Sequence, residues 1–368
     1  MQISGRQLFW LVFSIEIVLT MLYAVSAAAI EANQDAWISM LLAGLMGFGI
    51  VFLIVKLSMR YPQQTFVQYS QTILGKWGGK IVILPYFIMW VYLNSMALRN
   101  SADFVYLTLF TKTPLYVIMV TLLILVIYVI FVGGLAGIAR CGELMGPIIL
   151  VVILGTCMLS INHLDWHHLT PVFVDSGWKN IMQGSISGVA FYGDIIMFTM
   201  IFAFMSNSKQ ALSVTMWGMA LTAVLVVAAS MMVIMTFGSI LPTRMWAPFF
   251  GMTRFISVLG FIQNVDILFV IIWLFSAFIK LSLFLFITVY GTAQWLNIKN
   301  WRILLWVFAP ITLVLALLPQ NATAPIKEYV QHFWIPFVIP VNVIGIPLLL
   351  WLVSVIRGKS MQRKDEFN

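Results

Sequence analysis

The stretch GSISGVAFYGDIIMFTMIFAFM, residues Gly184–Met205, decides how this chain is interpreted. It is apolar, and it is long enough to cross a bilayer, which takes about twenty residues. Its first half nevertheless contains Gly184, Gly188 and Gly193, and a carboxylate, Asp194, lies near its middle. A helical glycine costs about 1 kcal/mol relative to alanine, and an ionised Asp at the centre of a membrane helix costs about 3 kcal/mol. A helix that only anchored the protein would be expected to carry neither.

We therefore interpret this stretch as a discontinuous helix that lines a polar cavity in the middle of the membrane. The alternative is a glycine-rich face that packs tightly on a neighbouring helix, with Asp194 neutral or paired.

The composition places the chain among polytopic membrane proteins. Of its 368 residues, 62% are hydrophobic and 9% are charged, and the mean hydropathy is +1.02. Soluble domains have about 45–50% apolar and about 25% charged residues. The sequence has no phosphate-binding loop, no HExxH and no GxSxG, and its histidines lack an accompanying ligand set, so we expect no enzyme, no metal and no cofactor. Any transport would be secondary.

Windows of about twenty apolar residues predict ten membrane spans in a single membrane domain, 1–368. The predicted spans are 8–30, 35–57, 81–107, 115–134, 144–162, 183–205, 211–237, 264–292, 301–318 and 333–356. Five spans in each half require the halves to run in opposite directions, which is the layout of two inverted repeats, 8–162 and 183–356.

The basic residues predict the orientation. With the N-terminus inside, thirteen Lys and Arg side chains fall in inner segments and six in outer ones, and Lys280 lies within a span. The excess of positive charge places both termini, including the tail 357–368, in the cytoplasm. The net charge of +8 is therefore a topology signal and not a sign of nucleic-acid binding. The segment 243–263 is amphipathic and aromatic, and we interpret it as an outer lid or surface helix.

Ionisable groups inside spans predict a functional interior, because such groups face the bundle, pair or line a path. Glu16 lies about 13 Å from the cytoplasmic end of span 1, and Lys280 about 18–20 Å from that of span 8. We therefore predict that Lys280 pairs with a carboxylate, with Glu16 as first choice and Asp194 as second. The alternative is that Lys280 bonds only to carbonyls or extends to the interface.

Polar residues in two spans complete a candidate ligand site. Tyr92 and Asn94 lie in span 3 and Tyr192 in span 6, next to Gly193 and Asp194. Together with Gly184 and Gly188 they are the predicted ligand-binding residues. A broken helix offers free N–H groups to a ligand carboxylate and carbonyls to an ammonium group. The alternative is that the Tyr and Asn side chains bond to neighbouring helices.

Four segments resemble the B subunits of GerA-type spore germinant receptors, endospore germination permeases of the amino acid–polyamine–organocation superfamily. They are ISGRQLFWLVFSIEI (Ile3–Ile17), NQDAWISMLLAG (Asn33–Gly44), YPQQTFVQYSQTILGKWGGK (Tyr61–Lys80) and VDILFVIIWLFSAFIKLSLF (Val265–Phe284). Superfamily members usually have a glycine where helix 1 is broken, and Ser14–Asn33 contains none.

The resemblance implies an all-α fold of ten helices in two inverted five-helix repeats, as in the LeuT-like transporters, with helices 1 and 6 around a central site. It implies a receptor subunit in the spore inner membrane, with both termini on the spore core side, that binds a germinant such as an amino acid or a sugar and triggers germination. The implied partners are a membrane A subunit and a lipoprotein C subunit. The alternative function is a proton-coupled secondary amino acid transporter, with the proton on Glu16 or Asp194.

Overall fold

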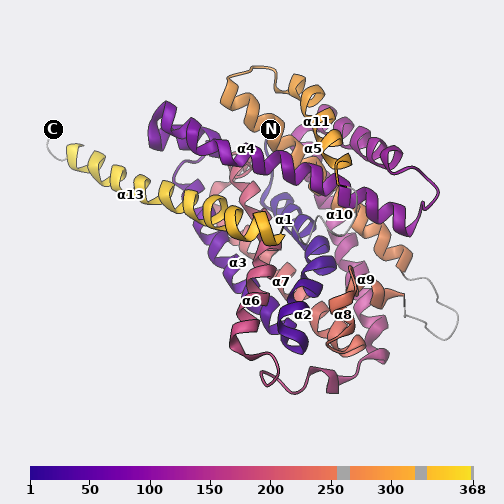
Figure 1. Ribbon diagram of the computed structural model, residues 1–368. Coiled ribbons are helices and arrows are strands. Elements are labelled where there is room, and N and C mark those ends of the chain that lie inside the picture. The colour runs from indigo at the N-terminus through magenta and orange to yellow at the C-terminus, as the bar shows by residue number, and fades with distance from the viewer. Residues whose placement is uncertain (255–265, 320–329, 366–368) are drawn as a thin grey trace.

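The protein is a bundle of helices (Figure 1). The computed structural model describes residues 1–254, 266–319 and 330–365. Within these ranges the β pairing is limited to an isolated bridge between Ile3 and Met205. The main elements are α1 Gly5–Leu19, η1 Thr20–Ala24, α2 Val25–Ala32, α3 Ala36–Met59, α4 Phe66–Thr108, α5 Leu115–Ser160, α6 Gly177–Tyr192, η5 Gly193–Met200, η6 Phe202–Phe204, α7 Ala211–Phe237, α8 Leu241–Arg244, α9 Pro248–Thr253, α10 Asp266–Leu296, α11 Leu305–Leu317, η9 Val330–Gly345 and α13 Ile346–Asp365.

Seven helical segments of the described chain are long and apolar enough to cross a membrane, and Trp301–Leu317 is a shorter apolar helix. Two of the seven each contain two of the ten predicted spans. Gly5–Met59 has 55 residues, about 80 Å of helix against a hydrocarbon core of about 30 Å. It is interrupted at Asn33, where φ is +48°, and α5 is interrupted at Gly134, where φ is +54°. The all-α membrane fold is confirmed, whereas the boundaries of the two repeats remain a prediction.

Helix α1 occupies the centre of the bundle. Every residue from Leu11 to Val18 is buried, and α1 packs against α5, α7 and α10. A helix that is apolar around its whole circumference has to be enclosed by others. Helix α10 packs in turn against α4 and α5, and α3 packs against α6 and α7. This packing buries Glu16, in the last turn of α1, away from water.

The segment Tyr61–Lys80 contains the start of α4. Thr65 and Gln68 form a capping box at this helix start, and Gly75, with φ +82°, interrupts the helix. The C-terminal helix α13 docks beside it, because Arg60 Nη1 donates to Ser354 Oγ at 2.9 Å and Arg357 donates to the carbonyl of Ile73.

A buried ion pair, Arg99 with Asp103, lies within α4. Arg99 Nε donates to Asp103 Oδ2 at 2.8 Å within α4, and both side chains are less than 10% exposed. Arg99 also donates to the carbonyls of Ala316 and Pro319 at the end of α11. The i,i+4 spacing brings the two charges together on one helix face, and this pairing allows both to be buried.

Candidate functional site

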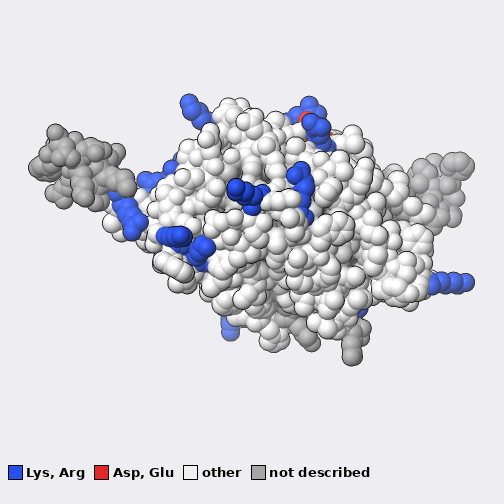
Figure 2. All heavy atoms as spheres, turned by 90° about the horizontal axis from the view of Figure 1, so that it is seen from above, with Lys and Arg blue, Asp and Glu red and all other residues white. Residues whose placement is uncertain are grey.

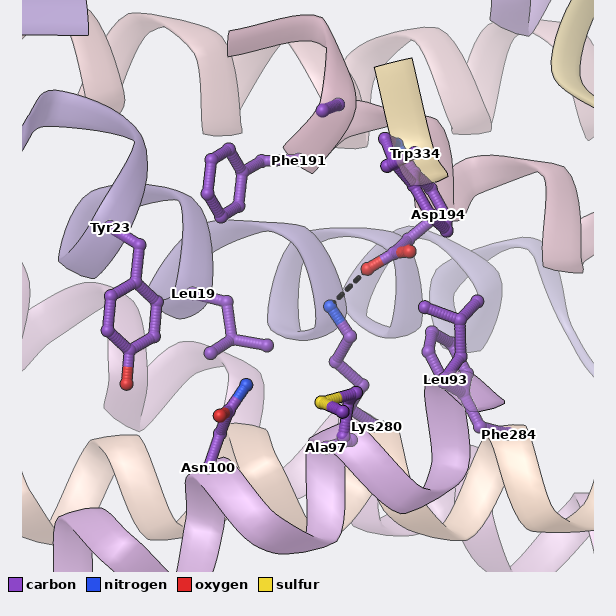
Figure 3. Close-up of a pocket in the computed structure, with 12 residues that line it drawn as sticks. Leu19, Tyr23, Leu93, Ala97, Asn100, Phe191, Asp194, Lys280, Phe284 and Trp334 are labelled. Carbon is purple, nitrogen blue, oxygen red and sulfur yellow. Dashed lines mark hydrogen bonds and ion pairs between the residues drawn. The ribbon is translucent and has the colours of Figure 1, made fainter. Parts of the chain in front are cut away.

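A buried ion pair joins the sixth and eighth predicted spans, both in the second half of the chain. Lys280, in the middle of α10, donates from Nζ to Oδ2 of Asp194, at the start of η5 (Figure 3). The two side chains are only 6% and 10% exposed. Burying a single charge is very costly unless it is paired and hydrogen-bonded. The pair therefore accounts for how Asp194 and Lys280 are tolerated in the bundle.

The pair lies in the wall of a cavity. The cavity volume is about 70 Å³, and a water molecule needs about 10–15 Å³ of such space, so several waters or one small organic ligand fit. Besides the two charged residues, its lining comprises Leu19, Tyr23, Leu93, Met96, Ala97, Asn100, Ala190, Phe191, Phe284 and Trp334 (Figure 3). An apolar and aromatic wall with a few polar groups is typical of small-molecule sites.

Irregular turns of two helices meet at this cavity. The first span changes from α1 to the π-helical turn η1 at Thr20, and its Leu19 and Tyr23 line the cavity. The sixth span changes from α6 to the 3₁₀-helix η5 at Gly193, next to Asp194. Departures from α geometry inside a helix often mark functional sites. The predicted discontinuity of span 6 is therefore a change of helix type at Gly193, and span 1 has one too.

The predicted pairing of Lys280 with Glu16 is wrong in this structure, because Lys280 bonds to Asp194, the second choice. Glu16 is 1% exposed, and neither of its carboxylate oxygens has a hydrogen-bond partner. It lies close enough to Asp194 and Lys280 to interact with both electrostatically. The depths expected from the sequence placed Glu16 and Lys280 within reach of each other, but they left open which way each helix faces. The direction in which Lys280 points is decided by how α10 is rotated.

Two of the predicted glycines form a helix contact and are not among the residues that line the cavity. A Cβ on Gly184 would lie 2.7 Å from Ser39 Oγ, and a Cβ on Gly188 would lie 2.7 Å from Ala43 Cβ. Gly184 and Gly188 therefore belong to a glycine-rich face that packs tightly on a neighbouring helix, and they bring α6 close to α3. Gly193 differs from them, because a Cβ there would approach the ring of Trp334, a lining residue, at 3.2 Å.

The predicted aromatic and amide ligands also lie outside the cavity lining. Asn94 Nδ2 donates to Thr288 Oγ1 at 2.7 Å and so ties α4 to α10. Tyr92 contacts the ring of Phe333 at 5.8 Å between centroids. Tyr192 is fully buried, its hydroxyl has no hydrogen-bond partner, and it lies near Glu16. For Asn94, the alternative of a bond to a neighbouring helix holds.

The α4 residues that do line the cavity follow a helical stripe. Leu93, Met96, Ala97 and Asn100 are spaced i, i+3, i+4 and i+7, which places them on one face of α4. Asn100 is the polar member of this stripe, about two turns beyond the predicted ligands Asn94 and Tyr92. Periodicity could have found this face, but nothing in the sequence distinguished it from the face toward Thr288.

An aromatic cluster from the region of α8 and α9 packs on Tyr23, a residue that lines the cavity. The ring of Trp246 lies 6.3 Å from Tyr23 and 5.7 Å from Phe104, and Phe250 lies 5.2 Å from Phe104. Ser26 Oγ donates to the carbonyl of Met245 at 2.9 Å, which fixes this segment to α2. These residues belong to the predicted lid 243–263, of which 255–263 lie outside the described residues. The described part contacts the cavity wall through Trp246, which packs on the lining residue Tyr23.

The fold is that of the membrane proteins that share the LeuT-like transporter architecture. The structure resembles Mhp1, a nucleobase-cation-symport-1 family transporter, with a TM-score of 0.68, 12% identity and coverage of 89% of this chain and 75% of Mhp1. It also resembles MhsT, with a TM-score of 0.66, 15% identity and coverage of 95% and 88%. At these identities the likeness shows the fold alone, and it confirms the expected ten-helix architecture.

The chain belongs to the spore germination protein family, whose model matches residues 2–325. The spore germination protein YndE of Bacillus subtilis (strain 168) is 27% identical over 331 residues, which cover 88% of this chain and 87% of YndE. The spore germination protein KB of the same organism is 24% identical, covering 98% of this chain and 97% of that protein. This chain is therefore an integral membrane protein of the germination permease family. Family and fold are those of receptor and transporter proteins rather than of enzymes.

Proposed function

We propose that this chain is a membrane subunit of a nutrient germinant receptor, which binds a small germinant in the cavity beside Asp194 and Lys280 and thereby triggers spore germination. The observation that carries the proposal is the cavity itself, where a buried ion pair, an apolar wall and two irregular helix turns meet. The germinant is an amino acid or a sugar. Mhp1 with bromovinylhydantoin bound and MhsT in complex with L-phenylalanine support the view that this fold admits small organic ligands.

A receptor needs two states that the ligand binds with different affinity. In the described state Trp246 of the proposed lid packs on the lining residue Tyr23, and Met245 is hydrogen-bonded to Ser26. Ligand entry would require the lid to move, and the irregular turns η1 and η5 are the places where the two central helices bend most easily. The change would then pass to a membrane A subunit and a lipoprotein C subunit, which are proposed as partners.

The charge distribution supports the proposed orientation. One face of the molecule carries many Lys and Arg side chains and little acidic surface (Figure 2). Positive charge favours the cytoplasmic side. We place this face and both termini on the core side of the spore inner membrane.

The test is germinant binding to the assembled receptor. Ala97→Phe fills the cavity from α4, and Val224→Phe adds the same ring on α7 at a position that is 66% exposed. The proposal expects Ala97→Phe to abolish binding of a germinant identified on spores, with the complex still assembled, and Val224→Phe to leave binding unchanged. Equal binding by both variants would move the recognition site to a partner.

The alternative function is a proton-coupled secondary amino acid transporter, and the buried, unbonded carboxylate of Glu16 favours it. Uptake distinguishes the two functions, since a transporter accumulates labelled amino acid in liposomes under a proton gradient and a receptor subunit does not.

A further inference from the structure

The interior charges do not balance. The site contains two carboxylates, Asp194 and Glu16, and one cation, Lys280. Lys280 bonds to Asp194, and Glu16 is left with neither oxygen bonded. An ionised carboxylate in such surroundings is so costly that the group stays neutral instead. Glu16 is therefore a second carboxylate partner for Lys280, and it is not bonded to Lys280 in this state.

The packing of α1 on α10 brings Glu16 within reach. Ser276 Oγ donates to the carbonyl of Ser14 at 2.6 Å, which sets the two helices level at that point. As the first and eighth spans they run antiparallel. Glu16 follows Ser14 by two residues and Lys280 follows Ser276 by four, so their Cα atoms differ in depth by about 9 Å. Side chains lean toward the N-terminus of their own helix, so these two lean toward each other, and the lysine stem is long and flexible.

We propose that Lys280 is an exchangeable counter-ion: it bonds to Asp194 in the empty site and moves to Glu16 when the ammonium group of a ligand takes its place at Asp194. This inference rests on the proposed function and names its ligand class, a small primary amine with an apolar body, such as a neutral amino acid. Asp194 lines the cavity and is accessible to such a group, whereas Glu16 is not among the lining residues. The exchange shifts a bond of α10 from η5 to α1.

The exchange gives each ammonium group a carboxylate partner, and the carboxylate that an amino acid brings with it remains in the cavity, where Asn100 is a polar lining residue. A ligand ammonium enters, Glu16 gives up its proton to the solvent, and the resulting carboxylate pairs with Lys280. The titratable groups that face Glu16 are Asp194 on η5, Lys280 on α10 and Tyr192 on α6. Helix α7 has no ionisable side chain, and on α5 Glu143 bonds to Arg6, at the start of α1. Binding of the amine should therefore release about one proton per ligand.

The first experiment needs no ligand. Infrared spectra of the purified full chain with isotope-labelled glutamate report whether Glu16 is a neutral acid, and Glu16→Gln identifies its band. The natural chain should show the acid band. Asp194→Asn should abolish it, because Lys280 then moves to Glu16, and adding Lys280→Met to Asp194→Asn should restore it. An acid band that persists in Asp194→Asn, or is absent from the natural chain, overturns the exchange.

A stability measurement covers the case in which single variants fold poorly. Asp194→Asn and Glu16→Gln should each be tolerated, since Lys280 keeps one carboxylate. The double variant should unfold at a much lower denaturant concentration than the two single shifts predict, and Lys280→Met in that background should recover the loss. Additive shifts without recovery count against a shared lysine.

The second experiment uses L-alanine as the amine probe and propionate, which lacks the amine, as its matched control on the assembled complex. L-alanine should remove the Glu16 acid band and release a proton, Glu16→Gln should lose the proton release, and propionate should do neither. L-alanine that binds while the band remains overturns ligand-driven exchange. No binding of L-alanine, with the exchange still seen in Asp194→Asn, refutes the ligand class and the proposed site while the shared lysine stands.

Discussion

Replacing Gly188 by alanine tests the contact between α6 and α3. The added Cβ would lie 2.7 Å from Ala43 Cβ and 2.8 Å from Met40 Cε. The methionine end can move aside, whereas the alanine Cβ is fixed to its backbone. Overpacking of this kind costs about 1–3 kcal/mol. The gain in helix propensity from glycine to alanine offsets about 1 kcal/mol of it.

Gly49→Ala is the matched control, because a Cβ there meets nothing within 4 Å. It contributes the same propensity gain without the clash. The free energy of unfolding, measured by denaturant titration in detergent micelles, should therefore be about 1–3 kcal/mol lower for Gly188→Ala than for Gly49→Ala. Adding Ala43→Gly to Gly188→Ala should recover most of that difference. If Gly188→Ala proves as stable as Gly49→Ala, the close approach of α6 and α3 at this glycine is incorrect.

Three further outcomes are expected. Arg99→Met leaves Asp103 as a buried, unpaired acid and should lower the free energy of unfolding by about 3–5 kcal/mol. A second change, Asp103→Leu, should recover much of that loss. Equal stability of Arg99→Met and the natural chain would show that the pair is solvated. Trp246→Ala removes the ring that packs on Tyr23. In a background without Cys141 and Cys157, it should speed the labelling of Asn100→Cys by a thiol reagent added outside. The exposed, lipid-facing control Trp306→Ala should not change the labelling rate. Trp77→Cys and Val174→Cys, both highly exposed positions, should be labelled by a membrane-impermeant reagent from opposite sides only, and labelling of both from one side would overturn the proposed topology.

The aromatic contacts and the buried pair describe one state of the site. Trp246 packs on the lining residue Tyr23, Phe250 packs on Phe104, and Lys280 bonds to Asp194. A ligand that enters has to displace these aromatic contacts and compete with Lys280 for Asp194. Because of both steps, the ligand makes different contacts with the described state and with the state it induces. A ligand can shift a two-state equilibrium only if its contacts with the two states differ in this way.

Several features of the site could be predicted from the sequence because they depend on local chemistry. A carboxylate at 194 and a lysine at 280 within apolar runs had to be buried and paired, and they are. Gly193 before Asp194 predicted a change in the helix, which the structure shows as the start of η5. The π-helical turn η1 had no such signal, because Thr20–Ala24 contains neither glycine nor proline.

The sequence by itself determined the membrane class, the helical fold, the approximate spans and the burial of Glu16, Asp194 and Lys280, since each follows from composition and from hydropathy along the chain. Only the tertiary structure decided which carboxylate holds Lys280, that Gly184 and Gly188 serve packing, and that Leu93, Ala97 and Asn100 line the cavity. The physical reason is rotation. Hydropathy fixes how deep a residue lies in the bundle, but the direction in which a helix faces depends on its contacts with helices that are distant in the chain.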